Sequence, residues 1–464
     1  MRNSLDLLDR HAHLHPQTDP KVLERDGPII FERGNGVTVT DSSGRSYIEG
    51  MASLWCATLG FTNPRLAKTA HDQILTLASY HTFNRRANPP AIELSEKLLS
   101  IAPMSDGKVS FCNSGSEAVD TMIKLAWLYQ SAHGRPRKRK IISRHNAYHG
   151  STVMGATLSG LPHVRGAMAV EDNDVVLFAA APHHYRQAQK DETPESFTAR
   201  MLSELDALIQ REGPENIAAM IVEPVMGAGG VIIPPEGYYR DIEALLRRHD
   251  ILLLSDEVIC GFGRTGHWFG CQAFGFTPDM MSVAKGLSSG YQPIGATLMS
   301  GEIYQAVSEE AGRLGVFGHG FTYAGHPVTS AVALETLRIY DEIDLLGRVR
   351  SLSKAFLAHL HSFSDHALVG ETRGIGMIGA LELVADKVSR APFPPSGRVG
   401  ARLIELVMER GIILRNLGDV IAICPPLVIE EAEIATLFSR LSDALADLQN
   451  ELLASTSIGR EVSA

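Results

Sequence analysis

The sequence predicts an α/β fold with a mostly parallel central sheet in a large domain and a smaller α+β domain at the C-terminus. Two observations support this prediction. Through the middle of the chain, short apolar runs rich in β-branched residues alternate with amphipathic helical stretches. After about Tyr340, long helical stretches surround only two strand-like runs. Apolar strands that alternate with helices form sheets that are mostly parallel and covered on both faces.

The predicted elements follow in order along the chain. Near the N-terminus, GVTVTDSSGRSYIEG predicts a hairpin that turns at Ser43 and Gly44. Strands of the large domain are predicted at residues 108–112, 140–145, 174–180, 217–224, 250–259 and 279–285, with helices at 116–132 and 238–249. Strand-like runs at 377–384 and 420–427 belong to the smaller domain. We therefore expect an N-terminal segment, residues 1–65, that packs with the small domain and the active site, then a large domain at 66–339 and a small domain at 340–464.

Composition excludes several classes of protein. The chain has 464 residues, 44% of them hydrophobic, and a formal net charge of −10, which argues against broad nucleic-acid binding. The one basic run, residues 134–140, fits a solvated loop between a helix and a strand. Five scattered cysteines without C-x-x-C spacing indicate reduced thiols. With no apolar leader and no apolar run long enough to span a bilayer, we expect a cytoplasmic protein without membrane or nucleic-acid partners.

Two charged residues end predicted buried strands. Asp256 follows the leucines of LLLSDEV, and Lys285 ends DMMSVAK about one strand-to-strand crossover later. A buried charge needs a partner, so a structural ion pair between Asp256 and Lys285 is one interpretation. The other is pyridoxal phosphate, which takes a Schiff-base lysine on its aldehyde and a carboxylate at its ring nitrogen.

Two further strand ends suit the same cofactor. FCNSGSEAVDTM places Ser114, Gly115 and Ser116 before a helix whose free N–H groups and dipole favour a phosphate. An ordinary helix N-cap at Ser116 is the alternative. HNAYHGST puts Tyr148 and His149 in a loop after a strand, where an aromatic ring could stack on a flat cofactor.

Two motifs suggest other chemistry. CGFGRTGHWF contains G-x-G-x-x-G, the dinucleotide motif, but no amphipathic helix opens at its third glycine and no acidic residue ends a second strand at the usual spacing. A nicotinamide-dependent oxidoreductase is therefore the weaker alternative. His183 and His184 suggest a metal, but no cysteine or carboxylate completes a ligand set at useful spacing. We expect no metal, and histidines at the surface or at the rim of a pocket.

Seven motifs, taken in order, resemble the class III pyridoxal-phosphate-dependent aminotransferases, and among them the omega-aminotransferases that accept pyruvate. They are GMASLWC, NSGSEAVDTMIK, YHGST, VEPVMGAGGVI, LLSDEVICGFGRTG, AKGLSSGYQPIGA and GHGFTYAGHP, in a resemblance that runs from about Leu14 to the last helix. It implies a transferase of PLP fold type I and a homodimer, or a pair of dimers, with active sites at the subunit interface. The implied reaction is a ping-pong transfer of an amino group from an amine or omega-amino acid to pyruvate or a similar 2-oxo acid. An aminomutase or racemase on the same fold is the alternative.

The resemblance also implies residue roles. Lys285 would carry the cofactor and shuttle the substrate proton, and Asp256 would pair with the pyridine nitrogen. Tyr148 and Val258 would pack on opposite faces of the ring. Further cofactor contacts are implied for Ser114, Gly115, Ser116, His149 and Glu223, with Thr322 reaching the phosphate from the other subunit. Substrate contacts are implied for Trp55, Phe83, Ala228, Ile259 and Arg415, the last matching an arginine that clamps the acceptor's carboxylate.

The sequence departs from the family pattern near the substrate. Gln17 stands where some relatives place a phenylalanine, and Phe83 is followed by Asn84 and then by Arg85 and Arg86. Our hypothesis is that Gln17 and the positive potential of Arg85 and Arg86 favour donors with a distal acidic or polar group over purely apolar amines. The alternative is that both arginines face solvent or the partner subunit.

Overall fold

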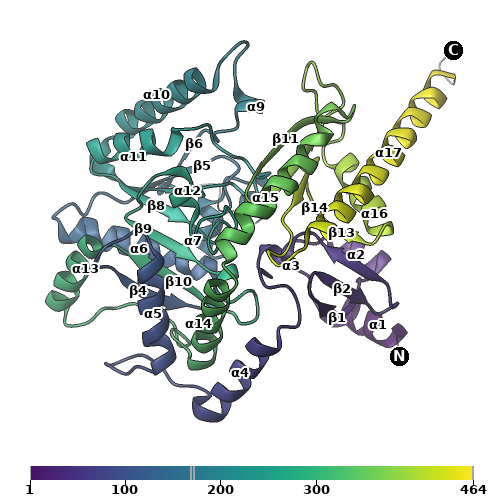
Figure 1. The fold of residues 1–464 in the computed structure, drawn as a ribbon. Helices are drawn as coiled ribbons and strands as arrows, with labels where there is room; N and C mark the ends of the chain where they lie inside the picture. Colours follow the sequence, from purple (N-terminus) through teal and green to yellow (C-terminus); the bar gives the residue numbers. More distant parts are fainter. Residues whose placement is uncertain (1, 168–169, 171–172, 462–464) are drawn as a thin grey trace.

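The computed structural model describes residues 2–167, 170 and 173–461. A seven-stranded sheet in the order β4-β10-β9-β8-β7-β5-β6 forms its centre (Figure 1). β10 runs antiparallel to β4 and β9, and the other neighbours are parallel, which confirms the predicted α/β class. The sequence prediction lacked β10, a short run that starts with glycine. The strands are β4 (Lys108–Cys112), β5 (Lys140–Arg144), β6 (Val176–Ala179), β7 (Ile217–Val222), β8 (Leu252–Asp256), β9 (Met280–Val283) and β10 (Gly295–Met299).

Helices cover both faces of this sheet because alternate residues of each strand point to opposite sides. In β7, Ile221 packs in a cluster with α6 (Gly115–Ala132) and α13 (Gly301–Leu314). Its neighbour Val222 packs in a second cluster with α10 (Pro194–Glu212) and α11 (Tyr238–Arg248). Every residue of β7 is buried, as expected for a central parallel strand. The site described below therefore stands on a rigid sheet.

Two smaller sheets lie beside the large one. In the first, β1, β2, β3 and β13 are neighbours, with β13 parallel to β3, so the two ends of the chain share a sheet. Figure 1 shows the N-terminal strands next to the C-terminal helices. The predicted hairpin is confirmed as β2 and β3, with Gly44 in the left-handed region at φ 87°. The second sheet has the order β11-β12-β15-β14. The strands are β1 (Phe31–Asn35), β2 (Thr38–Asp41), β3 (Ser46–Glu49), β11 (Val369–Ile375), β12 (Ile378–Leu383), β13 (Ile412–Ile413), β14 (Arg415–Leu417) and β15 (Val420–Ile423).

Helices make up most of the remaining described chain. No helix in residues 2–167, 170 and 173–461 is both long and apolar enough to cross a membrane. The helices before residue 200 are α1 (Arg2–Ala12), α2 (Pro20–Asp26), α3 (Ala52–Trp55), α4 (Pro64–Leu77), α5 (Pro89–Ile101), α7 (Val153–Leu158), α8 (Pro162–Ala167) and α9 (His184–Gln187). The later ones are α12 (Gly270–Phe274), α14 (Pro327–Glu342), α15 (Leu345–His361), α16 (Arg398–Glu409) and α17 (Glu431–Glu461), with 3₁₀ turns at Pro214–Asn216, Lys285–Leu287 and Ser362–Asp365.

Candidate active site

A cavity of about 170 Å³ lies beyond the carboxyl ends of the parallel strands, where open α/β sheets bind their ligands. It brings together side chains that lie far apart in sequence. Its lining is Leu54, Gly115, Ser116, Tyr148, His149, Gly150, Glu223, Val225, Asp256, Val258, Ile259, Ala284 and Lys285. Most of the cofactor residues predicted from the sequence therefore share one pocket.

Lys285 enters this pocket from a strained turn after β9. Its φ of 44° is unusual for a residue with a side chain and is found more often at functional positions. Burial lowers the pKa of the Lys285 amine, and the charge of Asp256 opposes that effect only in part. Among the described residues, no carboxylate forms an ion pair with Lys285. The structural Asp–Lys ion pair considered from the sequence is therefore absent, and the amine is available for chemistry.

Asp256, at the end of β8, is fixed by three contacts. Its Oδ2 lies 2.8 Å from Nδ1 of His149. Its Oδ1 accepts hydrogen bonds from the Ser282 hydroxyl at 3.1 Å and the Val258 amide at 3.2 Å. His149 is almost fully buried, and its Nε2 has no protein partner in the structure. The carboxylate is thus oriented within the pocket by groups that leave Lys285 free.

The N-terminus of α6 opens onto the same pocket. Ser114 caps the helix by accepting from the Glu117 amide, so the alternative of an N-cap at Ser116 is wrong. Ser116 instead lies in the first turn, and its hydroxyl accepts from the Ser151 amide at 3.0 Å. A Cβ on Gly150 would lie 2.5 Å from that hydroxyl oxygen, so the chain needs glycine there. The free N–H groups and dipole of an 18-residue helix make this end suitable for an anion.

Glu223 joins two loops at the rim of the pocket. Its carboxylate accepts from the amides of Tyr148 at 3.0 Å and Gly227 at 3.2 Å. Burial raises the pKa of Glu223 to about 7. Glu223 therefore holds the loop that carries Tyr148 against the loop that carries Ala228, which is half-buried and lies outside the pocket lining.

A buried arginine, which the sequence analysis missed, holds the second loop. Arg373 of β11 donates to the carbonyl oxygens of Gly230 and Val231, with distances of 2.6 to 3.2 Å. Val231 is fully buried at φ 54°, a costly conformation for a β-branched residue. Arg373 also forms ion pairs with Glu371 and Glu382. No local sequence signal predicts that this arginine holds the loop, because the two carbonyl groups lie more than a hundred residues away from it.

The segment around α3 contributes a pocket residue that the sequence did not predict, while the substrate contact predicted for Trp55 stays a prediction. Trp55 is buried in a hydrophobic cluster, and the neighbouring Leu54 lines the pocket instead. This segment is strained, since Ser53 and Trp55 both have positive φ. Its conformation is held by Glu49, whose carboxylate accepts from the Met51 and Ser53 amides. Burial raises the pKa of Glu49 to about 7.

Arg415 approaches the site from the edge strand β14. It is half-buried, and this burial lowers the pKa of its guanidinium, while the nearby Tyr148 opposes the effect. Among the described residues, Arg415 forms no ion pair with a carboxylate. A partly desolvated arginine without a partner is suited to bind an incoming carboxylate.

Several predicted residues lie away from Lys285 within the chain. Gln17 is exposed in the loop after α1, and Thr322 is exposed before α14. Phe83, Arg85 and Arg86 line a separate cavity of about 1160 Å³. None of these residues lines the Lys285 pocket. Their predicted contacts with substrate or phosphate, some of which require a second subunit, stay predictions.

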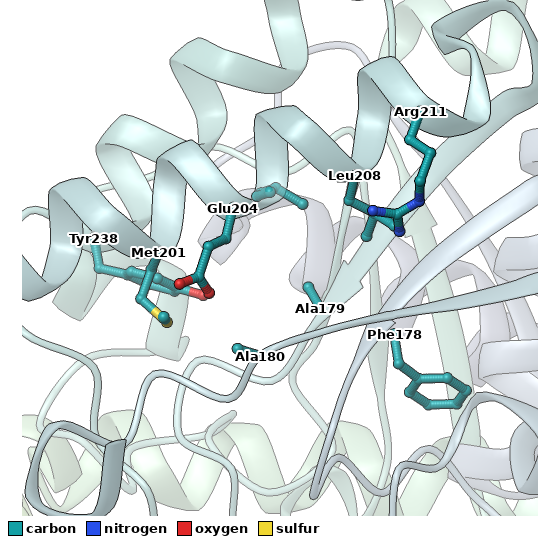
Figure 2. Close-up of a pocket in the computed structure, with 9 residues that line it drawn as sticks. Phe178, Ala179, Ala180, Met201, Glu204, Leu208, Arg211 and Tyr238 are labelled. Atoms are coloured by element: carbon teal, nitrogen blue, oxygen red, sulfur yellow. The ribbon is translucent and has the colours of Figure 1, made fainter. Parts of the chain in front are cut away.

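Three further features that the structure describes lie outside the lining of the Lys285 pocket. His183 is buried at 8% exposure, so the prediction of a surface or rim position is wrong. It meets Glu371 and Glu382, which the sequence analysis missed because they lie on distant strands. A second cavity lies beside β6 and α10, where Glu204 and Arg211 are the charged lining residues (Figure 2). The segment CGFGRTGHWF forms turns after β8 without the helix that a dinucleotide site needs.

The pocket fits pyridoxal phosphate on structural grounds. An unpaired lysine and a fixed carboxylate lie in one cavity with a helix N-terminus and an orphaned buried imidazole nitrogen. A Cβ on Gly115 would come within 2.9 Å of Val258, so glycine keeps the helix entrance open beside that side chain. These are the groups that the cofactor's aldehyde, ring nitrogen and phosphate require.

Comparisons with known proteins agree with this geometry. A family model described as "Aminotransferase class-III" matches residues 22–445. Gamma aminobutyrate transaminase 3, chloroplastic, of Solanum lycopersicum is 44% identical over 426 residues, covering 92% of this chain and 82% of that protein.

Solved structures extend the match to nearly the whole fold. The omega transaminase of Pseudomonas jessenii in complex with PMP has a TM-score of 0.95 and 46% identity, covering 96% of this chain and 98% of that chain. The PMP-bound aminotransferase of Vibrio fluvialis has a TM-score of 0.94 and 38% identity, covering 96% of this chain and 98% of that chain. The predictions of fold type I, of pyridoxal phosphate and of amino transfer to a 2-oxo acid are confirmed. The chain belongs to the class III aminotransferases, enzymes that use pyridoxal phosphate.

Proposed function

We propose that this aminotransferase is an omega-aminotransferase that takes its amino group from a primary amine or omega-amino acid and gives it to pyruvate. The observation that carries the proposal is the placement of Arg415, which is partly desolvated and lies near Tyr148, a residue that lines the pocket of Lys285 and Asp256. Among the described residues, Arg415 forms no ion pair. An acceptor with a carboxylate needs such a cation, and a neutral amine does not. The names of the relatives support the class, since they include gamma-aminobutyrate and omega transaminases.

The roles of the pocket residues follow from their surroundings. When bound, pyridoxal phosphate supplies an aldehyde that accepts the amino group and a ring that takes up the electron pair left when the substrate loses its proton. Lys285 is the residue that would hold the cofactor covalently. Burial lowers the pKa of the Lys285 amine. Once a substrate amine has displaced Lys285 from the cofactor, its Nζ would therefore be a ready base for moving the substrate proton. Asp256, oriented by His149, would hold a proton at the ring nitrogen.

The substrate side combines fixed and adjustable groups. Leu54 and Ile259 form apolar wall, and the loop of Ala228 borders it. Arg415 would bind the acceptor's carboxylate and move aside for an uncharged amine. Gamma-aminobutyrate carries a distal carboxylate, so the relatives named for it support our hypothesis that donors with a distal acidic group are accepted.

Three further properties complete the proposal. The chain acts as a homodimer with shared active sites, in which Thr322, Phe83, Arg85 and Gln17 complete the partner's pocket. The separation of these residues from Lys285 within one chain supports this arrangement. The large domain spans residues 66–339, flanked by the N-terminal segment and the small domain at 340–464. Five free cysteines support a cytoplasmic location.

The test is a substrate panel with the purified holoenzyme. Neutral aryl amines and omega-amino acids are each incubated with pyruvate, and alanine and the oxo product are quantified. The proposal predicts equal amounts of alanine and deaminated donor, with double-reciprocal plots that are parallel, as ping-pong kinetics require. Rearranged or racemised donor without alanine would instead show an aminomutase or racemase.

A further inference from the structure

Three side chains with metal-binding atoms meet where α1 ends. The His13 amide donates to the Asp9 carbonyl at 2.9 Å, so helical geometry brings these two side chains together at a spacing of four residues. Nδ1 of His13 lies 3.0 Å from Oδ1 of Asp9. The loop then turns His15 back, and its Nε2 lies 2.8 Å from Oδ2 of the same carboxylate. The two imidazole rings are 4.4 Å apart between centroids.

This arrangement matches a small tetrahedral cation site. One ligand atom from each residue lies within 4.8 Å of the other two. Zinc binds histidine nitrogen and carboxylate oxygen at about 2.0–2.2 Å, so ligand atoms around it are separated by about 3.4 Å. Both imidazole nitrogens lie 3.0 Å from Oδ1 of Asp9, so these two separations need to open by about 0.4 Å to reach that value. All three side chains are partly exposed, with His13 at 63%, so they have room to adjust.

Asp9 has no lysine or arginine partner among the described residues, and the adjacent Arg10 pairs with Asp6. The second cluster of this kind, His183 with Glu371 and Glu382, differs in this respect. There Arg373 contacts both carboxylates and Arg186 contacts Glu382, so positive charge is already in place.

We propose that Asp9, His13 and His15 bind a divalent transition cation of the zinc class, with water as the fourth ligand. Two imidazoles and one carboxylate form a ligand set that suits zinc rather than calcium or magnesium, which prefer oxygen. Solvent reaches the site through a cavity of about 230 Å³ that His11 also lines. The bound ion ties the end of α1 to the loop that carries Gln17.

The test is calorimetric titration of Zn²⁺ into untagged holoenzyme freed of excess pyridoxal phosphate and metal. The variants are His13→Ala, His15→Ala and the isosteric Asp9→Asn. His11→Ala is the matched control, because His11 lines the same cavity but lies outside the cluster. His183→Ala probes the other cluster. Co²⁺ is titrated in parallel, because its visible absorption reports tetrahedral coordination.

We expect one Zn²⁺ per chain in the wild type and in His11→Ala and His183→Ala. Each of the three ligand variants should bind at least about tenfold more weakly and lose the tetrahedral Co²⁺ bands. Unchanged binding in His13→Ala and His15→Ala would overturn the proposal, as would loss of the site in His11→Ala or His183→Ala alone. Absence of saturable binding in the wild type would overturn it as well.

Discussion

The cofactor end and the substrate wall of the pocket are built in different ways. The cofactor end, defined here as Gly115, Ser116, Asp256 and Lys285, stands at strand ends and at a helix N-terminus of one sheet. The substrate wall, defined as Leu54, Ile259, Arg415 and the loop 226–232, draws on three sheets. Two of its segments have backbone strain and are held by the distant residues Glu49 and Arg373.

We infer from this difference that the cofactor end determines whether the reaction occurs and that the substrate wall determines which substrate is used. Changes at the cofactor end should remove activity toward every substrate, because the same groups serve both half-reactions. Changes at the substrate wall should alter one half-reaction or one donor. The following predictions test that separation, starting with the largest expected effect.

Lys285→Ala should lower kcat by about 10⁴-fold for all donor and acceptor pairs, since no other amine in the pocket can move the substrate proton. Its thermal stability should not fall, because the buried amine has no ion-pair partner to lose. Lys138 is the matched control: it is also buried, but its Nζ donates to the carbonyls of His249 and Asp250. Lys138→Ala should lose about 1–3 kcal/mol of stability and keep its kcat. Steady-state kinetics and thermal melts check both variants, and substantial turnover by Lys285→Ala would refute the role.

Arg415→Ala should raise KM for pyruvate by about 10- to 150-fold, the equivalent of one lost hydrogen-bonded charge pair. The half-reaction with a neutral amine should change by less than about twofold, because that substrate has no carboxylate. Single-turnover measurements of each half-reaction separate the two effects. Arg410→Ala, which removes a half-buried arginine paired with Asp447, is the control. An equal loss in both half-reactions would show that Arg415 supports the fold instead.

Arg85→Ala should slow a donor with a distal carboxylate by about two- to fivefold relative to a chain-matched neutral amine, as expected for an exposed ion pair. The measurement is kcat/KM for both donors. Arg86→Ala, the adjacent variant, separates the two arginines. If both donors keep their rates in Arg85→Ala, this arginine has no part in choosing the donor.

Glu49→Gln should show a pH-dependent change in stability. Burial raises the pKa of Glu49 from 4.5 to about 7, so the folded protein holds a proton that the unfolded chain releases between those values. The contribution of Glu49 to the free energy of unfolding of the wild type is therefore greatest at low pH and is lost as the pH rises through 7. The difference in Tm, variant minus wild type, should be more positive at pH 8 than at pH 5. A difference that is constant with pH would mean that Glu49 titrates normally.

The sequence predicted the cofactor end far better than the substrate wall. Asp256 and Lys285 end buried apolar runs, and a charged residue in that position can be recognised from the sequence alone. The sheet then brings such ends to one edge, whatever the details of the loops. Even there, the alternative interpretation placed the helix N-cap at Ser116 instead of Ser114, because the two serines are chemically equivalent and two residues apart.

The substrate wall depends on contacts that no local pattern reveals. Trp55 was expected to contact the substrate, but in this chain it is buried next to an exposed Leu54 that lines the pocket, in a segment where Ala52, Ser53 and Trp55 have positive φ. Arg373 meets Gly230 across a gap of 143 residues, so its role appears only in three dimensions. In the fold, β10 and the edge strands β11 and β14 were missed, since short runs with glycine or charge lack a clear period.

The visible absorption spectrum of the purified protein tests the central claim most directly. Wild type and Lys285→Ala are incubated with pyridoxal phosphate, then with an amine, then with pyruvate. We predict that the wild type is yellow, bleaches with the amine and regains its colour with pyruvate, whereas Lys285→Ala completes no such cycle. A wild-type protein that stays colourless after incubation with pyridoxal phosphate would contradict the assignment of this pocket.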